Sequence, residues 1–172
     1  MIITAGIYKG RKILAPDEKI TRPTLSKTRM GVFNTLFSIM GSFEGKSFLD
    51  LFGGSGIMGL EALSRGFDRV DICELNKQSA AIIKQNYLLI GKEPNLFIGD
   101  SLKFVSKNDI CYDVVYVDPP YRSGIYDEIL PKVKGKIIVA EHDKSIDFSK
   151  YNVIKQKNYG GKLVTYIGGS LE

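Results

Sequence analysis

The chain has 172 residues, of which 44% are hydrophobic and 25% are charged, and its formal net charge is +5. This length allows one domain with a substantial core and is too short for two ordinary domains. No apolar run approaches the ~20 residues of a membrane span, and no secretory signal is visible. Two distant cysteines and a single histidine argue against a metal site. We therefore expect a cytoplasmic protein with reduced thiols and no metal.

The positive charge is concentrated at the N-terminus. Residues 1–46 contain eight Lys and Arg against three Asp and Glu, whereas the remaining residues contain 16 of each kind. Such a basic segment is typical of phosphate contacts in nucleic-acid-binding proteins. We call residues 1–46 the N-terminal extension and predict that it binds nucleic acid without folding independently of the domain formed by residues 47–172.

The extension itself contains two predicted features. Strand-like segments at 2–8 and 11–15 flank Lys9-Gly10 and predict a β-hairpin. Helical spacing of apolar residues predicts a helix over 25–40, with Thr24 as its N-cap and Gly41 at its end.

Strands and helices alternate after residue 46. Buried strands are predicted at 48–52, 70–74, 96–98, 114–117 and 137–140, and helices at 57–65, 77–90 and 125–133. The segments 153–156 and 163–167 predict a final hairpin around Asn158–Gly161. This alternation predicts an α/β fold with a mostly parallel, doubly wound sheet and an antiparallel C-terminal edge.

A glycine-rich turn follows the first of these strands. Gly54, Gly56 and Gly59 match a dinucleotide-binding fingerprint, and Glu74 lies 20 residues after Gly54, where a carboxylate could bind ribose hydroxyls. The motif alone suits a nicotinamide cofactor or S-adenosylmethionine. Asp50 favours the second, because a carboxylate there would repel a pyrophosphate but attract a cationic amino-acid group. Asp100 and Ser101, at another strand end, could bind an adenine amine.

The segment Asp118-Pro119-Pro120-Tyr121 ends the strand at 114–117. Two prolines terminate a strand because neither donates a backbone N–H. The segment thereby places a carboxylate, free carbonyls and an aromatic ring at the carboxyl end of the sheet, where ligands bind in open α/β folds. Asp118 and a carbonyl could accept both hydrogens of an NH2 group, and Tyr121 could stack on a planar base.

These residues resemble the bacterial small-subunit (16S) ribosomal RNA guanine-N2 methyltransferases of the RsmD type. The resemblance runs from about Ile3 to Tyr166. Its markers are Gly6, Lys9-Gly10-Arg11, Thr21–Thr24, Arg29, Phe33-Asn34, Leu49-Asp50, Phe52–Gly56, Gly59–Gly66 and Asp118–Tyr121. The sequence departs from the family pattern at Ser26, Lys27 and Met30, where Asp, Arg and Glu are usual, and at Gly53, where Ala is usual.

The resemblance implies a Rossmann-like class I S-adenosylmethionine-dependent methyltransferase that acts on 16S rRNA in the small ribosomal subunit or its assembly intermediate. We also expect a monomer. The resemblance implies catalytic roles for Asp118, Pro119 and Tyr121, and RNA contacts for Arg11, Arg22 and Arg29. The implied cofactor site comprises Asp50, Phe52, Gly53, Gly54, Gly56, Glu74, Leu75, Asp100 and Ser101.

Three other functions stay open. An adenine-N6 methyltransferase of DNA or RNA could use the same amine-binding segment. A nicotinamide oxidoreductase could use the glycine fingerprint, and a non-catalytic RNA-binding assembly factor could retain the fold. Glu141 and His142 end the strand at 137–140 and could border the site, although we expect them to have a structural role.

Overall fold

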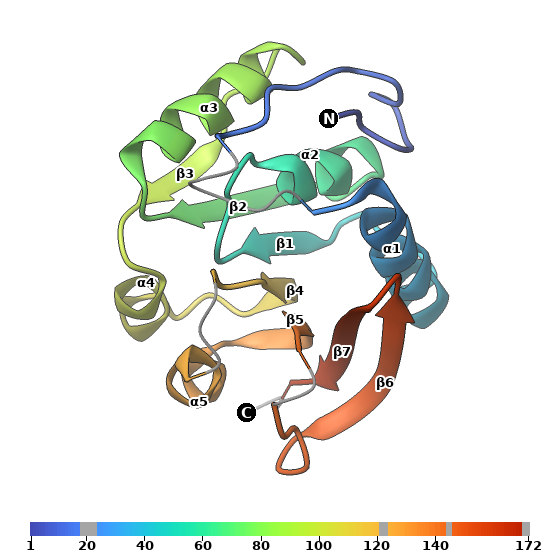
Figure 1. Ribbon diagram of the computed structural model, residues 1–172, viewed down its shortest axis with the longest axis vertical. Coiled ribbons are helices and arrows are strands. Elements are labelled where there is room, and N and C mark those ends of the chain that lie inside the picture. The colour runs from blue at the N-terminus through green and yellow to red at the C-terminus, as the bar shows by residue number, and fades with distance from the viewer. Residues whose placement is uncertain (18–23, 121–123, 144–145, 170–172) are drawn as a thin grey trace.

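The computed structural model describes residues 1–17, 24–120, 124–143 and 146–169. Within these residues, seven strands form one sheet in the order β3-β2-β1-β4-β5-β7-β6 (Figure 1). The strands are β1 (Ser47–Asp50), β2 (Arg69–Glu74), β3 (Asn95–Ile98), β4 (Tyr112–Val117), β5 (Gly135–His142), β6 (Asn152–Tyr159) and β7 (Lys162–Gly168). The helices are α1 (Ser26–Met40), α2 (Ile57–Ser64), α3 (Lys77–Leu88), α4 (Ser101–Lys107), α5 (Ile125–Ile129) and the 3-10 helix η1 (Leu130–Lys132).

The sheet is parallel from β3 to β5, and β7 and β6 add an antiparallel edge. Strand β1 pairs with β2 on one side and with β4 on the other, so the direction of chain winding reverses beside β1. In open α/β sheets the ligand site lies at the carboxyl ends of the strands at this reversal. The predicted doubly wound sheet with an antiparallel C-terminal hairpin is confirmed.

Alternate residues of the central strands pack on opposite faces of the sheet. Phe48 and Val114 belong to a core cluster that also contains residues of α1, α2 and α3, whereas Leu49 and Val115 belong to a second cluster with residues of α4 and α5. Strands that are buried on both faces read as continuous apolar runs. For this reason the strand predictions agree with the observed strands to within a few residues.

Three local predictions were wrong. The N-terminal hairpin contains only one isolated antiparallel bridge, between Ile2 and Lys12, rather than two strands. The N-cap of α1 is Leu25, not Thr24, and no side chain caps it. Helix α4 was not predicted, although Asp100 caps it by accepting a hydrogen bond from the Lys103 N–H at 3.0 Å.

The C-terminal hairpin is joined to α1 by one tyrosine. The Tyr159 hydroxyl lies 2.8 Å from Thr35 Oγ1, 3.0 Å from the Gly31 carbonyl and 2.9 Å from the Tyr166 hydroxyl. A Cβ at Gly31 would lie 2.3 Å from the Tyr159 ring, so glycine is required for this contact. The hairpin therefore anchors α1 against the antiparallel edge of the sheet.

Glu61 of α2 is a buried carboxylate that joins three segments of the chain. Its Oε1 accepts hydrogen bonds from the Thr4 N–H at 2.7 Å, the Thr4 hydroxyl at 2.8 Å and Arg29 Nε at 3.3 Å. Its Oε2 accepts a hydrogen bond from Arg65 Nε at 3.2 Å. We call residues 1–17 of the extension the N-terminal arm. The N-terminal arm, α1 and α2 therefore meet at one charged group that is shielded from solvent.

Arg29 is a structural residue, which corrects its predicted role in RNA binding. Its side chain is 1% exposed, against 0% for Glu61. Besides Glu61, it donates to the carbonyls of Ile2 and Thr24. Burial lowers the pKa of Arg29, and the charge of Glu61 opposes this shift. A guanidinium held in this way has no surface from which to reach a phosphate.

We expect Arg29→Met to destabilise the fold by about 2–4 kcal/mol, because it removes one partner of a buried ion pair. Lys27→Met is a matched control, since Lys27 is exposed on the same helix, and it should change the free energy of unfolding by less than about 0.5 kcal/mol. Urea unfolding of the two variants measures the difference. Equal free energies of unfolding would show that the Arg29–Glu61 pair contributes nothing.

Candidate functional site

The glycine turn connects the carboxyl end of β1 to the start of α2. The Gly53 N–H donates to the Cys73 carbonyl at 2.8 Å, and the Gly56 N–H donates to the Gly53 carbonyl at 2.8 Å. Gly54 and Gly56 have φ of 58° and 80°, in the left-handed region that favours glycine. The turn therefore reverses the chain tightly at the end of β1 and leaves Gly54 partly exposed there.

Gly53 occupies a position where no larger residue fits without displacement. A Cβ there would lie 2.4 Å from Ile72 Cγ2 and 3.0 Å from Ile83 Cδ1. The methyl group of Ile72 thus fills the space that an alanine at position 53 would need. This contact explains in physical terms why the chain has glycine where its resemblance predicts alanine.

Glu74, the last residue of β2, holds the turn in place. Its Oε2 accepts a hydrogen bond from the Gly54 N–H at 2.7 Å, and its Oε1 accepts one from the Asn76 N–H at 2.9 Å. Each carboxylate oxygen retains a second lone pair. The adjacent Leu75 is 67% exposed and Phe52 is half-buried, so apolar surface flanks the carboxylate. Glu74 and the glycine turn therefore form one unit, although they are 20 residues apart.

Asp100 and Ser101 lie between β3 and α4. The Asp100 side chain caps α4 through Oδ1. The Ser101 hydroxyl donates to the Leu51 carbonyl at 2.5 Å, which ties the start of α4 to the segment after β1. Ser101 therefore has a structural contact that the sequence did not indicate.

Asp50 is a buried carboxylate at the centre of this edge. It pairs in register with Ile72 of β2 and Tyr116 of β4, and its Oδ1 accepts a hydrogen bond from the Phe52 N–H at 3.1 Å. The pKa of Asp50 is raised to about 8, chiefly by burial and also by the negative charges of Asp118, Glu74 and Glu141, while the Phe52 hydrogen bond opposes the shift. A bound cation would reverse this effect by favouring the ionised form.

Asp118 follows β4 directly and is 24% exposed. Lys162 Nζ, at the start of β7, lies 4.0 Å from Asp118 Oδ1. Pro119 is partly buried beside it, and Tyr121 lies outside the described residues. Lys162 was not predicted at this position, because its approach to Asp118 depends on the antiparallel insertion of β7 next to β5.

Glu141 and His142 end β5 at the same edge. His142 Nε2 lies 2.6 Å from the Thr165 hydroxyl, Nδ1 lies 2.5 Å from the Asp143 carbonyl, and the ring packs on Phe148. Burial lowers the pKa of His142. The Tyr126 hydroxyl donates to the Glu141 carbonyl. Both ring nitrogens of His142 are therefore engaged by the protein, in agreement with its expected structural role.

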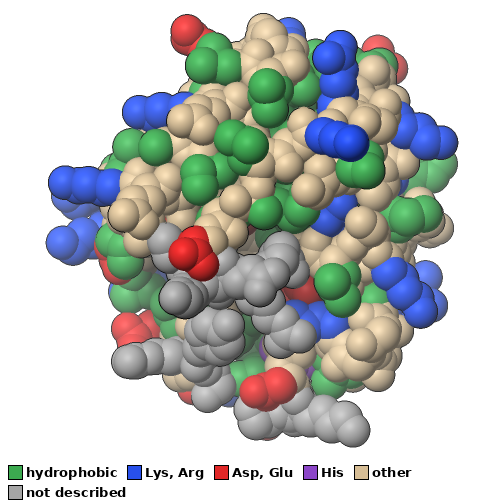
Figure 2. All heavy atoms as spheres, turned by 45° about the horizontal axis from the view of Figure 1, so that its top comes forward, with side chains coloured by type: hydrophobic (Ala, Val, Ile, Leu, Met, Phe, Trp, Pro, Cys, Tyr) green, Lys and Arg blue, Asp and Glu red, His purple; other side chains and the backbone are tan. Residues whose placement is uncertain are grey.

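The surface of the extension carries exposed basic residues. Lys9, Arg11 and Lys12 are all exposed, whereas Arg22 lies outside the described residues. Exposed apolar side chains flank them in sequence, Ile7 before Lys9 and Leu14 after Lys12. On the face shown in Figure 2, basic side chains lie on both sides, with apolar side chains between them. Of the three predicted RNA-binding arginines, only Arg11 is described and exposed.

The sequence matches the family model described as "Conserved hypothetical protein 95" over residues 1–168. The chain belongs to this family. The predicted membership of the RsmD-type methyltransferases is also confirmed by relatives named "Ribosomal RNA small subunit methyltransferase D". The Haemophilus influenzae protein is 32% identical over 95% of this chain and 90% of its own length. The Escherichia coli protein is 32% identical over 74% of this chain and 64% of its own length.

A solved structure has the same fold. The structure of yhhF from Escherichia coli, which carries a provisional methyltransferase assignment, superposes with a TM-score of 0.85 at 22% identity, covering 100% of this chain and 99% of that one. The family fold is therefore the Rossmann-like class I methyltransferase fold predicted from the sequence. Among the described helices, none is long and apolar enough to cross a membrane.

The pH dependence of stability tests the burial of Asp50. Its pKa is about 8 in the folded chain against an ordinary value of 3.8, so the unfolded chain loses this proton first as the pH rises. The stability associated with protonated Asp50 is present below about pH 4 and is lost progressively up to about pH 8. We expect Asp50→Asn to gain stability relative to the parent protein over this window, by about 1–3 kcal/mol.

Urea unfolding at pH 5, 7 and 9 measures this difference. Asp127→Asn serves as the control, because Asp127 is exposed on α5 and should follow the parent protein at each pH. Parallel pH profiles for Asp50→Asn and the parent protein would contradict the burial argument.

Proposed function

We propose that this chain transfers a methyl group from S-adenosylmethionine to the exocyclic N2 of a guanine in small-subunit (16S) rRNA. The observation that carries the proposal is the placement of Asp118 at the end of β4, where its charge acts on the buried Asp50 at the end of the neighbouring β1. An amine-accepting group and a cation-accepting group thus share one edge of the sheet. Membership in a family with rRNA methyltransferase relatives supports the choice of substrate.

The residues at the ends of β1 and β2 fit S-adenosylmethionine, which supplies an electrophilic methyl group on a sulfonium. Asp50 is a buried carboxylate whose ionised form needs a cation, and the amino-acid end of the cofactor carries one. Glu74 retains lone pairs for ribose hydroxyls, and Leu75 and Phe52 offer apolar surface for the adenine. Asp100 would accept a hydrogen bond from the adenine amine, beside Ser101. A pyrophosphate would meet the carboxylate of Glu74 and would further oppose the ionisation of Asp50, which disfavours a nicotinamide cofactor.

Asp118 and the Pro119 carbonyl activate and orient the acceptor amine. The lone pair of a guanine N2 is delocalised into the ring, so this nitrogen is a poor nucleophile. Two acceptors that bind its hydrogens favour a tetrahedral nitrogen with a localised lone pair, and Tyr121 stacks on the base. Positioning and pre-arranged acceptors supply the catalysis. This chemistry requires no metal ion.

The RNA must present an unpaired or extruded guanine to this edge. Exposed Arg11 and its basic neighbours in the extension, with Arg22, contact phosphates around the target. The substrate is the small subunit or an assembly intermediate, and the enzyme acts as a monomer in the cytoplasm.

Asp118→Ala should lower methyl transfer at least 100-fold, because it removes one of the two acceptors of the amine. Its affinity for S-adenosylhomocysteine should stay within about threefold of the parent value, since Asp118 binds the acceptor rather than the cofactor. Asp127→Ala, on the exposed side of the adjacent α5, is the matched control and should retain full activity. Full activity in Asp118→Ala would refute the mechanism.

The identity of the product decides between guanine and adenine. Small-subunit rRNA from cells that lack the gene, methylated in vitro and digested to nucleosides, should yield N2-methylguanosine by mass spectrometry. N6-methyladenosine would instead favour the adenine-N6 alternative.

Titration of the pure protein with S-adenosylhomocysteine and with NAD tests the cofactor, and binding of NAD alone would overturn the proposal. Cofactor binding without any product would favour an assembly factor.

A further inference from the structure

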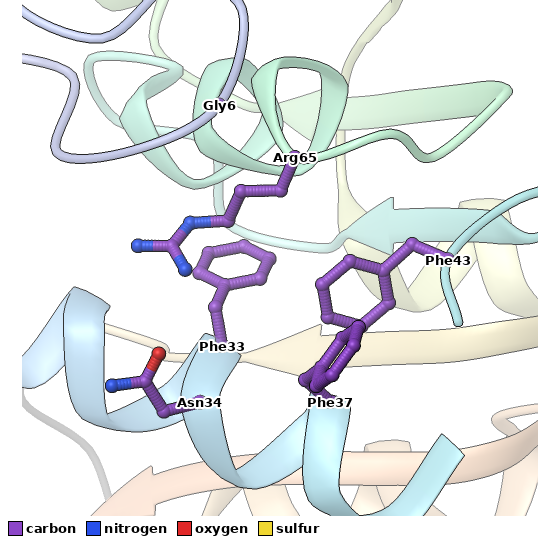
Figure 3. A pocket seen from close by; sticks show the side chains of 6 residues that line it. All are labelled: Gly6, Phe33, Asn34, Phe37, Phe43 and Arg65. Carbon is purple, nitrogen blue, oxygen red and sulfur yellow. The ribbon is translucent and has the colours of Figure 1, made fainter. Parts of the chain in front are cut away.

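A hollow of about 410 Å³ lies beneath the N-terminal arm, between α1 and the end of α2 (Figure 3). It is lined by Gly6, Phe33, Asn34, Phe37, Phe43 and Arg65. Phe33, Phe37 and Phe43 supply aromatic walls, and Asn34 and Arg65 supply polar groups. We call this feature the aromatic hollow.

The aromatic hollow lies at the amino end of β1, whereas the proposed methyl-transfer site lies at the carboxyl end. Phe43 precedes the first residue of β1, and Arg65 is the C-cap of α2, which returns from the carboxyl end of β1. Asp50, by contrast, is the last residue of β1. The length of β1 separates the hollow from Asp50, so the hollow can hold neither the cofactor nor the guanine that is methylated.

Four lining residues are among those that identify the family in the sequence: Gly6, Phe33, Asn34 and Arg65. None of them takes part in the proposed methyl transfer. Phe33 is a core residue, but Asn34 is exposed and its side-chain amide makes no hydrogen bond within the described part of the chain. The amide is therefore accessible to a ligand that enters the hollow.

Arg65 is fixed in a defined orientation. Its Nε donates to Glu61 Oε2 at 3.2 Å, its Nη2 donates to the Thr4 hydroxyl at 2.9 Å, and its guanidinium carbon lies 4.9 Å from the centre of the Phe33 ring. Its Nη1 makes no hydrogen bond to any described residue. A guanidinium held by three contacts, with one nitrogen still unengaged, is pre-organised to bind an acceptor.

We propose that the aromatic hollow binds one unpaired nucleotide of the substrate RNA, distinct from the nucleotide that is methylated. The base stacks on Phe37, which is 55% exposed, and the Asn34 amide bonds to the edge of the base. Arg65 Nη1 donates to the base or its phosphate. Aromatic stacking combined with side-chain hydrogen bonds is the usual way in which proteins recognise single-stranded RNA.

The charge around the hollow favours RNA over a protein partner. Gly6, at its rim, precedes the exposed Lys9, Arg11 and Lys12 in the same arm. Phosphates on either side of the bound base would meet these side chains. The volume also lies within the range of small-molecule sites, which is sufficient for one nucleotide. This inference rests on the proposed RNA substrate, and it adds a second anchoring point that fixes the register of the RNA.

Asn34→Ala and Phe37→Ala test the proposal, and Leu88→Ala, an exposed residue of α3, is the control. The KM for RNA should rise about fivefold or more in the two test variants, with kcat, affinity for S-adenosylhomocysteine and melting temperature unchanged. The control should match the parent protein in every measurement. If the parent protein methylates RNA and both test variants keep its KM, the hollow is not an RNA site, whereas a parent protein without activity would refute the proposed function itself.

A photo-crosslink identifies the occupant directly. With p-benzoylphenylalanine in place of Phe37, irradiation of the complex with small-subunit particles should crosslink the protein to one rRNA nucleotide, located by primer extension, that is not the methylated guanine. A crosslink to a ribosomal protein, to the methylated guanine or to no RNA at all would overturn the proposal.

Discussion

The buried carboxylate of Glu61 is the constraint on which the N-terminal half of the molecule depends. It accepts hydrogen bonds from the arm through Thr4, from α1 through Arg29 and from its own helix through Arg65. Two guanidinium groups compensate the desolvation of one carboxylate, and no apolar residue could specify three partners at once. The same contacts that fold the extension onto the sheet also shape the aromatic hollow, because Arg65 belongs to both.

The carboxyl ends of the central strands carry a cluster of carboxylates, in contrast to the ion-paired Glu61. Parallel strands bring Asp50, Glu74 and Asp118 together, and the charges of Glu74 and Asp118 help to raise the pKa of the buried Asp50. Glu74 accepts hydrogen bonds from two backbone N–H groups, which fix its carboxylate beside the glycine turn. Asp50 keeps a raised pKa, and shifts of this kind are common at functional sites. The ion pairs of Glu61 are thus separate from the carboxylate cluster at the carboxyl ends of the strands.

Local patterns in the sequence predicted the sheet, but they did not predict which charged side chains are buried or which charged groups contact one another. Apolar runs and glycine stops located the strands, and Asn76 capped α3 as expected. Arg29 was misassigned because a basic residue in a basic segment looks exposed, and its burial depends on Glu61, 32 residues away. The contact of Lys162 with Asp118 likewise arises from strand insertion. Helix α4 escaped prediction because its seven residues are too few for a clear helical period.

The contact between Gly53 and Ile72 limits the order in which this chain can change. An alanine at position 53 would collide with Ile72 Cγ2 at 2.4 Å, and a β-branched side chain on a buried strand cannot rotate away at low cost. Replacing Gly53 first would strain the glycine turn, whereas reducing Ile72 first would open space for the new methyl group. We therefore expect the two positions to be epistatic, and a glycine turn transplanted from a relative with alanine at position 53 would need a smaller residue at position 72 of β2.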